Sequence, residues 1–170
     1  MELDILHTYK SALRNLAPKR WLNDQCINFY YEYLEKEGGV GKEVRLIDPS
    51  SVALMLYTQD IDELFEIFDP LELDSAELIC CPINDNTDKF QESGGNHWAL
   101  LVYLKSDNKF HYYDSGSGVI PHVTKIASKL RCLIENNSDK KALQREMEEV
   151  VVMSNSPKQE NSYGTISTYF

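Results

Sequence analysis

The hydrophobic residues at the start of the chain recur at the spacing of an amphipathic helix. This stripe predicts a first helix that ends at Pro18, and its members are Leu3, Leu6, Tyr9, Leu13 and Leu16. Two shorter helices are predicted further along, over residues 48–57 (DPSSVALMLY) and 61–68 (IDELFEIF). Each of them begins with the polar or acidic residues that favour a helix start.

Residues 21–39, WLNDQCINFYYEYLEKEGG, predict a longer helix between these segments. Either Asn23 or Asp24 can cap its start, and Gly38–Gly39 can stop it. The helical spacing of its apolar residues places Ile27, Tyr30 and Leu34 on one face.

From residue 77 onward the hydrophobic pattern becomes that of strands. Three short segments are rich in apolar and aromatic residues and are separated by turn residues: 77–83 (ELICCPI), 97–104 (HWALLVYL) and 109–114 (KFHYYD). The residues SDNK predict a hairpin loop between the last two. Residues 122–137 then predict a helix with one apolar stripe, which consists of Val123, Ile126, Leu130 and Leu133. Residues 148–153 (EEVVVM) predict a further strand.

This order of elements is typical of an α+β fold. The chain has 170 residues, enough for a sizeable core, and we expect a single domain over residues 1–170. Apolar residues make up 42% of the chain and charged residues 26%, as in globular proteins generally. The net charge of −10 argues against a nucleic-acid-binding protein, because phosphate contacts need a basic face. It suits a partner that presents Arg and Lys.

The first residues, MELDILHTYK, have neither the basic segment nor the apolar core of a signal peptide. The longest apolar run, WALLVYL, is far too short to cross a bilayer. We therefore expect a cytoplasmic or nuclear protein that has no membrane partner. The cysteines form no C-x-x-C pair, which argues against a zinc site, and they are Cys26, Cys80, Cys81 and Cys132. We expect the adjacent Cys80 and Cys81 to be buried, inert thiols.

His97 and Asp114 form a candidate catalytic pair. His97 follows the loop ESGGN and opens a predicted strand, while Asp114 ends the next strand, just before SGSG. If the two strands form a hairpin, both side chains lie near the same end of the sheet. A carboxylate placed there can bond one imidazole nitrogen and set the tautomer. The other nitrogen would then face a thiol or hydroxyl nucleophile.

The same residues also have plainer explanations. His97 can cap a loop and Asp114 can form an Asx turn, and the two residues alone do not decide between these roles and catalysis. A metal site made of His97, His111 and Asp114 is a further alternative. The alternation of a strand turns His111 and Asp114 to opposite faces, so we expect no metal ion.

Four segments of the chain, in order, resemble the ubiquitin-like protease family of cysteine peptidases, the SUMO and sentrin proteases. They are WLNDQCINFYYEYL, PINDN…GGNHWALLVYL, FHYYDSGS and QENSY. The INDN…GG loop before His97 is similar to that of the deneddylase branch. The resemblance implies a papain-like cysteine peptidase fold of the ubiquitin-like protease type, without a cofactor. It also implies a ubiquitin-like modifier as partner, with the neddylation modifier as first choice and SUMO as second.

The resemblance further implies roles for individual residues. His97 would be the general base, Asp114 its orienting carboxylate, and Gln159 the side-chain donor of the oxyanion hole. Trp21 and Trp98 would line a narrow tunnel for a Gly-Gly tail, because only residues without side chains pass between two indoles. Core packing is the alternative for either indole. Asp24 would contact an Arg of the modifier, cap its helix, or do both.

The family's nucleophile is missing from its expected position. In the family the glutamine run continues as Q-x-N-x-x-D-C-G, and its cysteine attacks the substrate. Here Gly164 stands in place of the Asp and Thr165 in place of the Cys. A threonine hydroxyl is a weak nucleophile, and the enzymes that use one usually rely on an N-terminal amine as base.

We therefore expect the resemblance to end near residue 163. We also expect the domain to be incomplete at its C-terminus and to lack the family's C-terminal helices. The sequence predicts an inactive member of a cysteine peptidase family. It would be either a truncated product or a non-catalytic module that binds the modifier.

Overall fold

The computed structural model describes residues 10, 12, 14–18, 20–88, 94–116 and 118–138, and the backbone of 151–153. The helices are α2 (Asp24–Lys36), α3 (Pro49–Tyr57), α4 (Ile61–Phe68) and α5 (Val123–Ile134), with short 3-10 helices η1 (Asp69–Leu71) and η2 (Leu73–Ser75). The strands are β1 (Val44–Leu46), β2 (Leu78–Asn84), β3 (Trp98–Leu104), β4 (Lys109–Tyr113) and β5 (Val151–Met153). Helices and strands are mixed along the chain, so the predicted α+β class is confirmed.

Within the described residues the strands form one sheet in the order β1-β2-β3-β4-β5. The inner strands β2, β3 and β4 are antiparallel, whereas β1 runs parallel to β2 and β5 runs parallel to β4. The three predicted central strands, the hairpin loop and the strand at EEVVVM are confirmed. Pairing of Trp98 with Asn84 and of Leu100 with Tyr113 brings the start of β3 and the end of β4 to the same end of the sheet.

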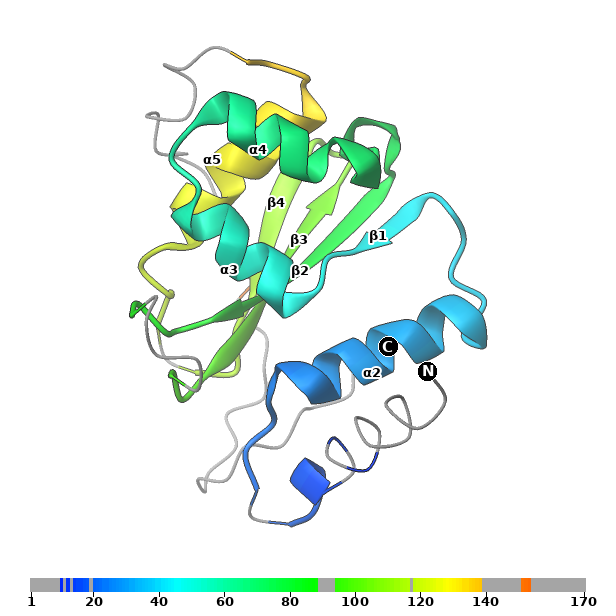
Figure 1. The fold of residues 1–170 in the computed structure, drawn as a ribbon, viewed down its shortest axis with the longest axis vertical. Helices are drawn as coiled ribbons and strands as arrows, with labels where there is room; N and C mark the ends of the chain where they lie inside the picture. Colours follow the sequence, from blue (N-terminus) through cyan, green and yellow to red (C-terminus); the bar gives the residue numbers. More distant parts are fainter. Residues whose placement is uncertain are drawn as a thin grey trace.

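One face of the sheet carries the hydrophobic core. Alternate residues of β2, β3 and β4 point into it and are almost completely buried; they include Ile79, Cys81, Leu101, Phe110 and Tyr112. Helices α3, α4 and α5 cover this face (Figure 1). The predicted stripe of α5 is confirmed, because its four residues are 0–6% exposed.

Helix α2 lies on the other side of the sheet (Figure 1). Its buried residues are Cys26 and Tyr31, and burial together with the nearby thiols of Cys80 and Cys81 raises the pKa of Tyr31 well above its ordinary value. Of the residues predicted to line one face of this helix, Ile27 and Leu34 are half-buried. Tyr30 is 36% exposed and stacks on the exposed Tyr33. The run NFYYEYL puts apolar side chains on several sides of this helix, so helical spacing alone does not select the buried side.

Only part of the predicted first helix lies within the described residues. Lys10, Ala12, Arg14 and Asn15 are helical, and the chain leaves the helix at Leu16. Leu3, Leu6, Tyr9 and Leu13 lie outside the described residues. Leu16, which was expected on the apolar stripe, is 52% exposed because it is already in the turn. Ala12 is fully buried, and its carbonyl accepts a hydrogen bond from the Cys26 thiol at 3.4 Å.

Side-chain caps fix the starts of α3 and α4. The carboxylate of Asp48 accepts from the backbone N–H of Ser51, and that of Asp60 accepts from Asp62 and Glu63. These bonds satisfy donors that a helix start leaves without an intrahelical partner.

A buried lysine holds the end of α3. Lys129, on α5, is 2% exposed, and its ammonium group donates to the carbonyls of Met55 at 2.7 Å, Leu56 at 3.0 Å and Thr58. These carbonyls lie at the negative end of the helix dipole, so a cation is stabilised there. Burial, with a smaller effect of Lys125, nevertheless lowers the pKa of Lys129 to about 8.

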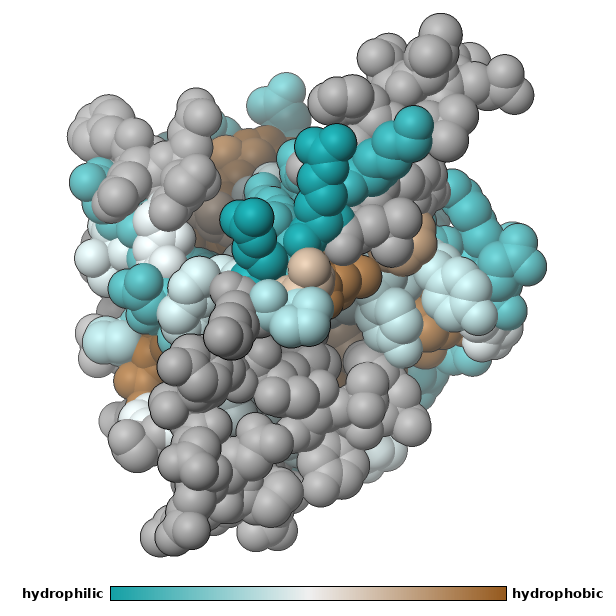
Figure 2. All heavy atoms as spheres, turned by 90° about the horizontal axis from the view of Figure 1, so that it is seen from below, coloured by the Kyte–Doolittle hydropathy of each residue, from teal (hydrophilic) through white to brown (hydrophobic). Residues whose placement is uncertain are grey.

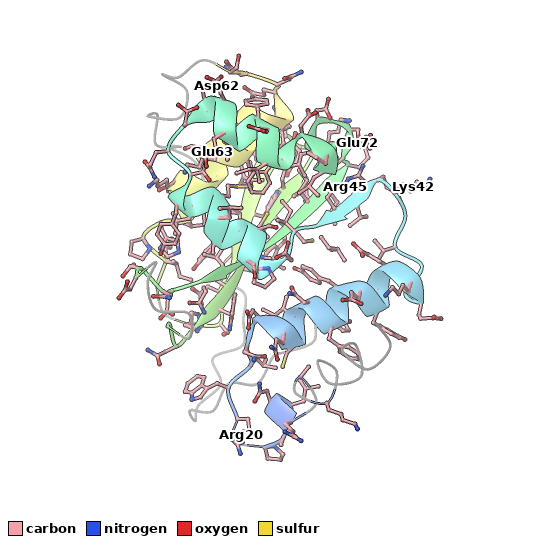
Figure 3. All side chains as sticks on the ribbon, in the orientation of Figure 1. Arg20, Lys42, Arg45, Asp62, Glu63 and Glu72 are labelled. Atoms are coloured by element: carbon pink, nitrogen blue, oxygen red, sulfur yellow. The ribbon has the colours of Figure 1, made fainter. Side chains whose placement is uncertain are left out.

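Strand β1 was not predicted from the sequence, and Arg45 anchors it. The guanidinium group donates to the carbonyl of Leu71 at 2.7 Å and to that of Lys42, and it lies 3.4 Å from a carboxylate oxygen of Glu72. Figure 3 shows Arg45 and Glu72 side by side at this edge of the molecule. These contacts join β1 to the two 3-10 helices that precede β2.

Seen from below, the described surface is mostly hydrophilic, with apolar side chains recessed between polar ones (Figure 2). Over the described residues, no helix is long and apolar enough to cross a membrane.

Candidate active site

His97 and Asp114 meet at the end of the sheet. Nε2 of His97 lies 2.5 Å from Oδ1 of Asp114, although the two residues are 17 positions apart. The β3–β4 hairpin creates this contact, because His97 immediately precedes β3 and Asp114 immediately follows β4. The predicted meeting of the two side chains is thus confirmed as geometry.

The carboxylate of Asp114 is held firmly in place. Its side chain is only 7% exposed, and besides the contact with His97 it accepts from the Tyr112 hydroxyl at 2.7 Å and from the backbone N–H of Gly116 at 2.6 Å. Burial alone would raise the pKa of Asp114. The bonds from Tyr112, Gly116 and His97 outweigh it and lower this pKa below its ordinary value. The group is therefore a carboxylate at neutral pH.

The pairing leaves the other nitrogen of His97 available. A carboxylate beside Nε2 holds a proton on that atom, so Nδ1 becomes the basic nitrogen of the neutral ring. The His97 side chain is 34% exposed, and it is therefore accessible from solvent while its partner is buried. An imidazole oriented in this way can take a proton from a nucleophile.

The backbone around His97 is locked to the end of β2. The Asp85 carboxylate accepts from the backbone N–H groups of Asn96 and His97, and the His97 carbonyl accepts from the N–H of Asp85 at 3.1 Å. Gly95 has φ +84°, and a Cβ there would overlap the side-chain oxygen of Asn84. The segments INDN and GGNHW therefore form one interlocked unit, and only glycine fits at position 95.

A second glycine lies directly beside the pair of His97 and Asp114. A Cβ at Gly116 would lie 3.0 Å from Oδ1 of Asp114 and 3.2 Å from Nε2 of His97. This is tighter than ordinary van der Waals contact, so a larger residue would push against the pair. Gly116 belongs to the predicted SGSG turn, and its closeness to the pair was not predicted.

The two tryptophans come from segments that the structure joins. The indole N–H of Trp98 donates to the carbonyl of Leu22 at 3.1 Å, and Leu22 follows Trp21 in the chain. Trp21 itself is 68% exposed, so core packing does not account for it. The tunnel for a Gly-Gly tail stays a prediction.

The capping role suggested for Asp24 is wrong. Asn23 is the N-cap of α2, and its side-chain oxygen accepts from the N–H of Cys26 at 3.2 Å. Asp24 is the first residue of the helix, and it is exposed. A role in contacting a partner stays a prediction for this residue.

The remaining histidines of the described part lie elsewhere. His111 bonds the carboxylate of Asp107 at 2.7 Å, which removes it from the metal site considered with His97 and Asp114. His122 lies 2.9 Å from the carbonyl of Asn84, and burial lowers its pKa. In the described part of the chain, no group of three or more His, Cys, Asp or Glu side chains is arranged to hold a metal ion.

All four cysteines are buried, and none of them forms a disulfide bond. Burial raises the pKa of Cys80 to about 11, and burial together with Cys80 raises that of Cys81. The expectation of buried thiols at these two positions is confirmed. The predicted oxyanion donor Gln159 and the nucleophile position Thr165 lie outside the described residues.

Comparisons with known proteins show the family to which the chain belongs. The family model described as the Ulp1 protease family, C-terminal catalytic domain, matches residues 20–165. The chain is 35% identical over 163 residues to the probable sentrin-specific protease 8 of Dictyostelium discoideum, covering 91% of this chain and 65% of that protein. It is 36% identical over 110 residues to NEDD8-specific protease 1 of Arabidopsis thaliana, covering 65% of this chain and 48% of that protein. It thus spans 65% or less of the length of these two relatives.

A solved structure of the SUMO protease Ulp1, with its catalytic cysteine oxidised to a sulfonic acid, superimposes with a TM-score of 0.62. The superposition covers 90% of this chain and 65% of that one, at 21% identity. At this identity the likeness establishes the fold, and the predicted cysteine-peptidase architecture of the ubiquitin-like protease type is confirmed.

Proposed function

Because the chain belongs to the Ulp1 protease family, we propose that it binds the C-terminal Gly-Gly tail of a ubiquitin-like modifier. We further propose that His97 and Asp114 stand where a cysteine-type peptidase that cleaves after that tail has its base and orienting carboxylate. The observation that carries this proposal is the 2.5 Å contact between Nε2 of His97 and Oδ1 of a buried Asp114. It gives the imidazole one fixed orientation and one free nitrogen.

The chemistry of such a site is acyl transfer through a thiol. His97 would accept the thiol proton at Nδ1, and the resulting thiolate would attack the carbonyl of the last glycine. The imidazolium, stabilised by Asp114, would return the proton to the amine that leaves. A water molecule would then release the acyl group from the thiol. Each step uses the orientation that Asp114 imposes on His97.

This chain has Thr165 where the family motif has the nucleophile, which favours binding without cleavage. A hydroxyl is much less acidic than a thiol, and the enzymes that use a threonine as nucleophile usually rely on an N-terminal amine as base. We therefore propose a non-catalytic, modifier-binding form of a deneddylase site. The neddylation modifier is the first choice of partner, because a relative that is 36% identical over 110 residues is named NEDD8-specific protease 1. SUMO is the second.

Titration of the 15N-labelled full chain tests the binding step. We expect the indole N–H of Trp98 and the amides of His97 and Gly116 to shift when the neddylation modifier is added. The same modifier without its last two glycines should leave them unchanged. SUMO added in parallel ranks the two partners. If neither modifier shifts these signals, or if the shortened modifier shifts them equally, the proposal is wrong.

A chemical test addresses the base. The double variant Gly164→Asp, Thr165→Cys restores a thiol at the family's position, and a modifier carrying an electrophile after Gly-Gly would capture it. We expect adduct formation that falls at least tenfold with His97→Ala, because the thiol loses its base. The matched control is His111→Ala, which removes a histidine bonded to Asp107 away from the pair. Equal capture in both histidine variants would refute the assignment of His97.

A further inference from the structure

Tyr112 stands directly behind the catalytic pair. Its side chain is completely buried, and its hydroxyl donates to Oδ2 of Asp114 at 2.7 Å. The same hydroxyl oxygen accepts from the backbone N–H of Ile120 at 3.0 Å. The contact between Asp114 and His97 uses the other carboxylate oxygen, Oδ1. Tyr112 and His97 therefore lie on opposite sides of one carboxylate.

We propose that Tyr112 is a positioning residue of the site, which acts through Asp114 and not on the substrate. By holding Oδ2, it fixes the rotation of the carboxylate that presents Oδ1 to Nε2 of His97. This inference rests on the proposed function, because it assumes that the His97–Asp114 pair is the base and its orienting carboxylate.

The direction of the Tyr112 bond is set by the backbone. An N–H group can only donate, so the hydroxyl oxygen must act as acceptor toward Ile120. Its own proton is then directed at the carboxylate of Asp114. Burial, reinforced by the carboxylate, raises the pKa of Tyr112 well above its ordinary value, so the phenol stays protonated and remains a donor. The arrangement is a fixed relay from the Ile120 backbone to Asp114.

The relay also links the pair to the segment that follows it. Gly116 donates its backbone N–H to Oδ1, while Ile120 reaches the carboxylate through Tyr112. The backbone after β4 therefore contacts both oxygens, one directly and one through a side chain. Rotation of the Asp114 carboxylate would break bonds on both sides, and this cost keeps Oδ1 aimed at His97.

A purely structural role for Tyr112 makes a different prediction. If Tyr112 only tied Ile120 to the core, its loss would lower stability without changing the state of the carboxylate. Tyr103 provides the matched control. It is another buried tyrosine on the same face of the sheet, and its hydroxyl donates to the side chain of Asn108 at 3.0 Å, away from the pair. Both Tyr→Phe changes remove one hydroxyl from a buried ring.

The experiment follows the carboxyl carbon of Asp114 by NMR in the full chain as pH is lowered. We expect Tyr112→Phe to move the titration midpoint of Asp114 upward, because a donor to the carboxylate is lost. Tyr103→Phe should leave the midpoint where it is. The ring N–H resonance of His97 supplies a second readout. We expect Tyr112→Phe to weaken it through faster exchange with water, while Tyr103→Phe should not.

A third form of the protein keeps the test decisive if Tyr112→Phe does not fold. Replacement of Tyr112 by 3-fluorotyrosine keeps the ring and both hydrogen bonds but makes the phenol a stronger donor. The Asp114 midpoint should then move downward. An unchanged midpoint, or equal movement in the Tyr103 variant, overturns the proposal. No modifier is used in these measurements, so failure of modifier binding would refute the proposed function and leave the role of Tyr112 standing.

Discussion

The carboxylate of Asp85 accepts a hydrogen bond from the backbone N–H of His97 at 3.1 Å. Asp85 follows β2 and His97 precedes β3, so this bond joins the ends of two neighbouring strands. The same oxygen accepts from Asn96 at 2.7 Å. His97 is therefore positioned from two directions, through its backbone by Asp85 and through its ring by Asp114.

Loss of the Asp85 side chain should loosen His97. We expect Asp85→Ala to lower the free energy of unfolding by roughly 1–2 kcal/mol, because two backbone donors lose a charged acceptor. Asp85→Asn should recover most of the loss, since its side-chain oxygen still accepts. Urea unfolding measures stability, and the amide shift of His97 reports its position. Equal losses in the two variants would show that charge matters here and the geometry of the bonds does not.

Gly95 should tolerate no side chain. Gly95→Ala combines a positive φ with overlap on Asn84, so we expect a loss of about 1–3 kcal/mol and displacement of His97. Gly39→Ala is the matched control. That glycine has φ +69°, but nothing lies within 4 Å of its Cβ position, so it carries the backbone strain alone.

Chemical denaturation and the His97 amide shift separate the backbone strain of a positive φ from the overlap with Asn84. Only Gly95→Ala should move the His97 signal. If the two glycine variants lose the same stability and neither moves that signal, the interlocking of INDN with GGNHW is not what holds His97.

Local patterns predicted the elements that carry the site. Short runs of apolar and aromatic residues between turn residues identified β2, β3 and β4, and the helical stripe of α5 is buried as expected. Strand β1 was missed because three residues, Val44–Leu46, form too short a run to detect. It exists through its parallel pairing with β2 and the bonds of Arg45, which are contacts between segments distant in sequence. Which side of α2 is buried also depends on a distant segment, because the buried side is the one that faces the sheet.

The candidate site was also predictable only in part, because some of its contacts are local and others join distant segments. The meeting of His97 and Asp114 was predictable because one hairpin creates it. The roles of Asp85 and Tyr112 were not, since each depends on the register of a strand against its neighbour. The motif INDN did carry a signal for Asp85, because an Asp at a strand end is a common acceptor for loop amides. Which loop it would bind could not be known from the pattern.

The buried Lys129 should be essential for stability. We expect Lys129→Met to lower the free energy of unfolding by about 2–3 kcal/mol, because the carbonyls at the end of α3 lose a charged donor in the core. Lys36→Met is the control, since Lys36 is exposed and its ammonium group pairs with its helix neighbour Glu32. That exposed pair should contribute less than about 0.5 kcal/mol.

Thermal and urea unfolding of the two lysine variants compare these contributions. A loss in Lys129→Met no larger than in Lys36→Met would mean that the end of α3 finds other donors.

The thiols of Cys80 and Cys81 should make the protein less stable at high pH. Burial raises the pKa of Cys80 to about 11 from the ordinary 9.0, and it also raises that of Cys81. Between pH 9 and 11 the unfolded chain releases protons that the folded chain keeps, so the free energy of unfolding falls as pH rises. The contribution of these thiols is fully present below pH 9. Lys129 acts in the opposite direction, because its lowered pKa favours folding as pH rises from about 8 to 10.5.

Comparing the wild-type chain with the double variant Cys80→Ala, Cys81→Ala cancels the contribution of Lys129, because both proteins contain this lysine. We expect urea unfolding to show a shallower decline between pH 9 and 11 in the variant, and a thiol reagent at pH 8 to label neither cysteine before unfolding. Equal slopes, or rapid labelling of the folded chain, would show that these thiols ionise as exposed ones do.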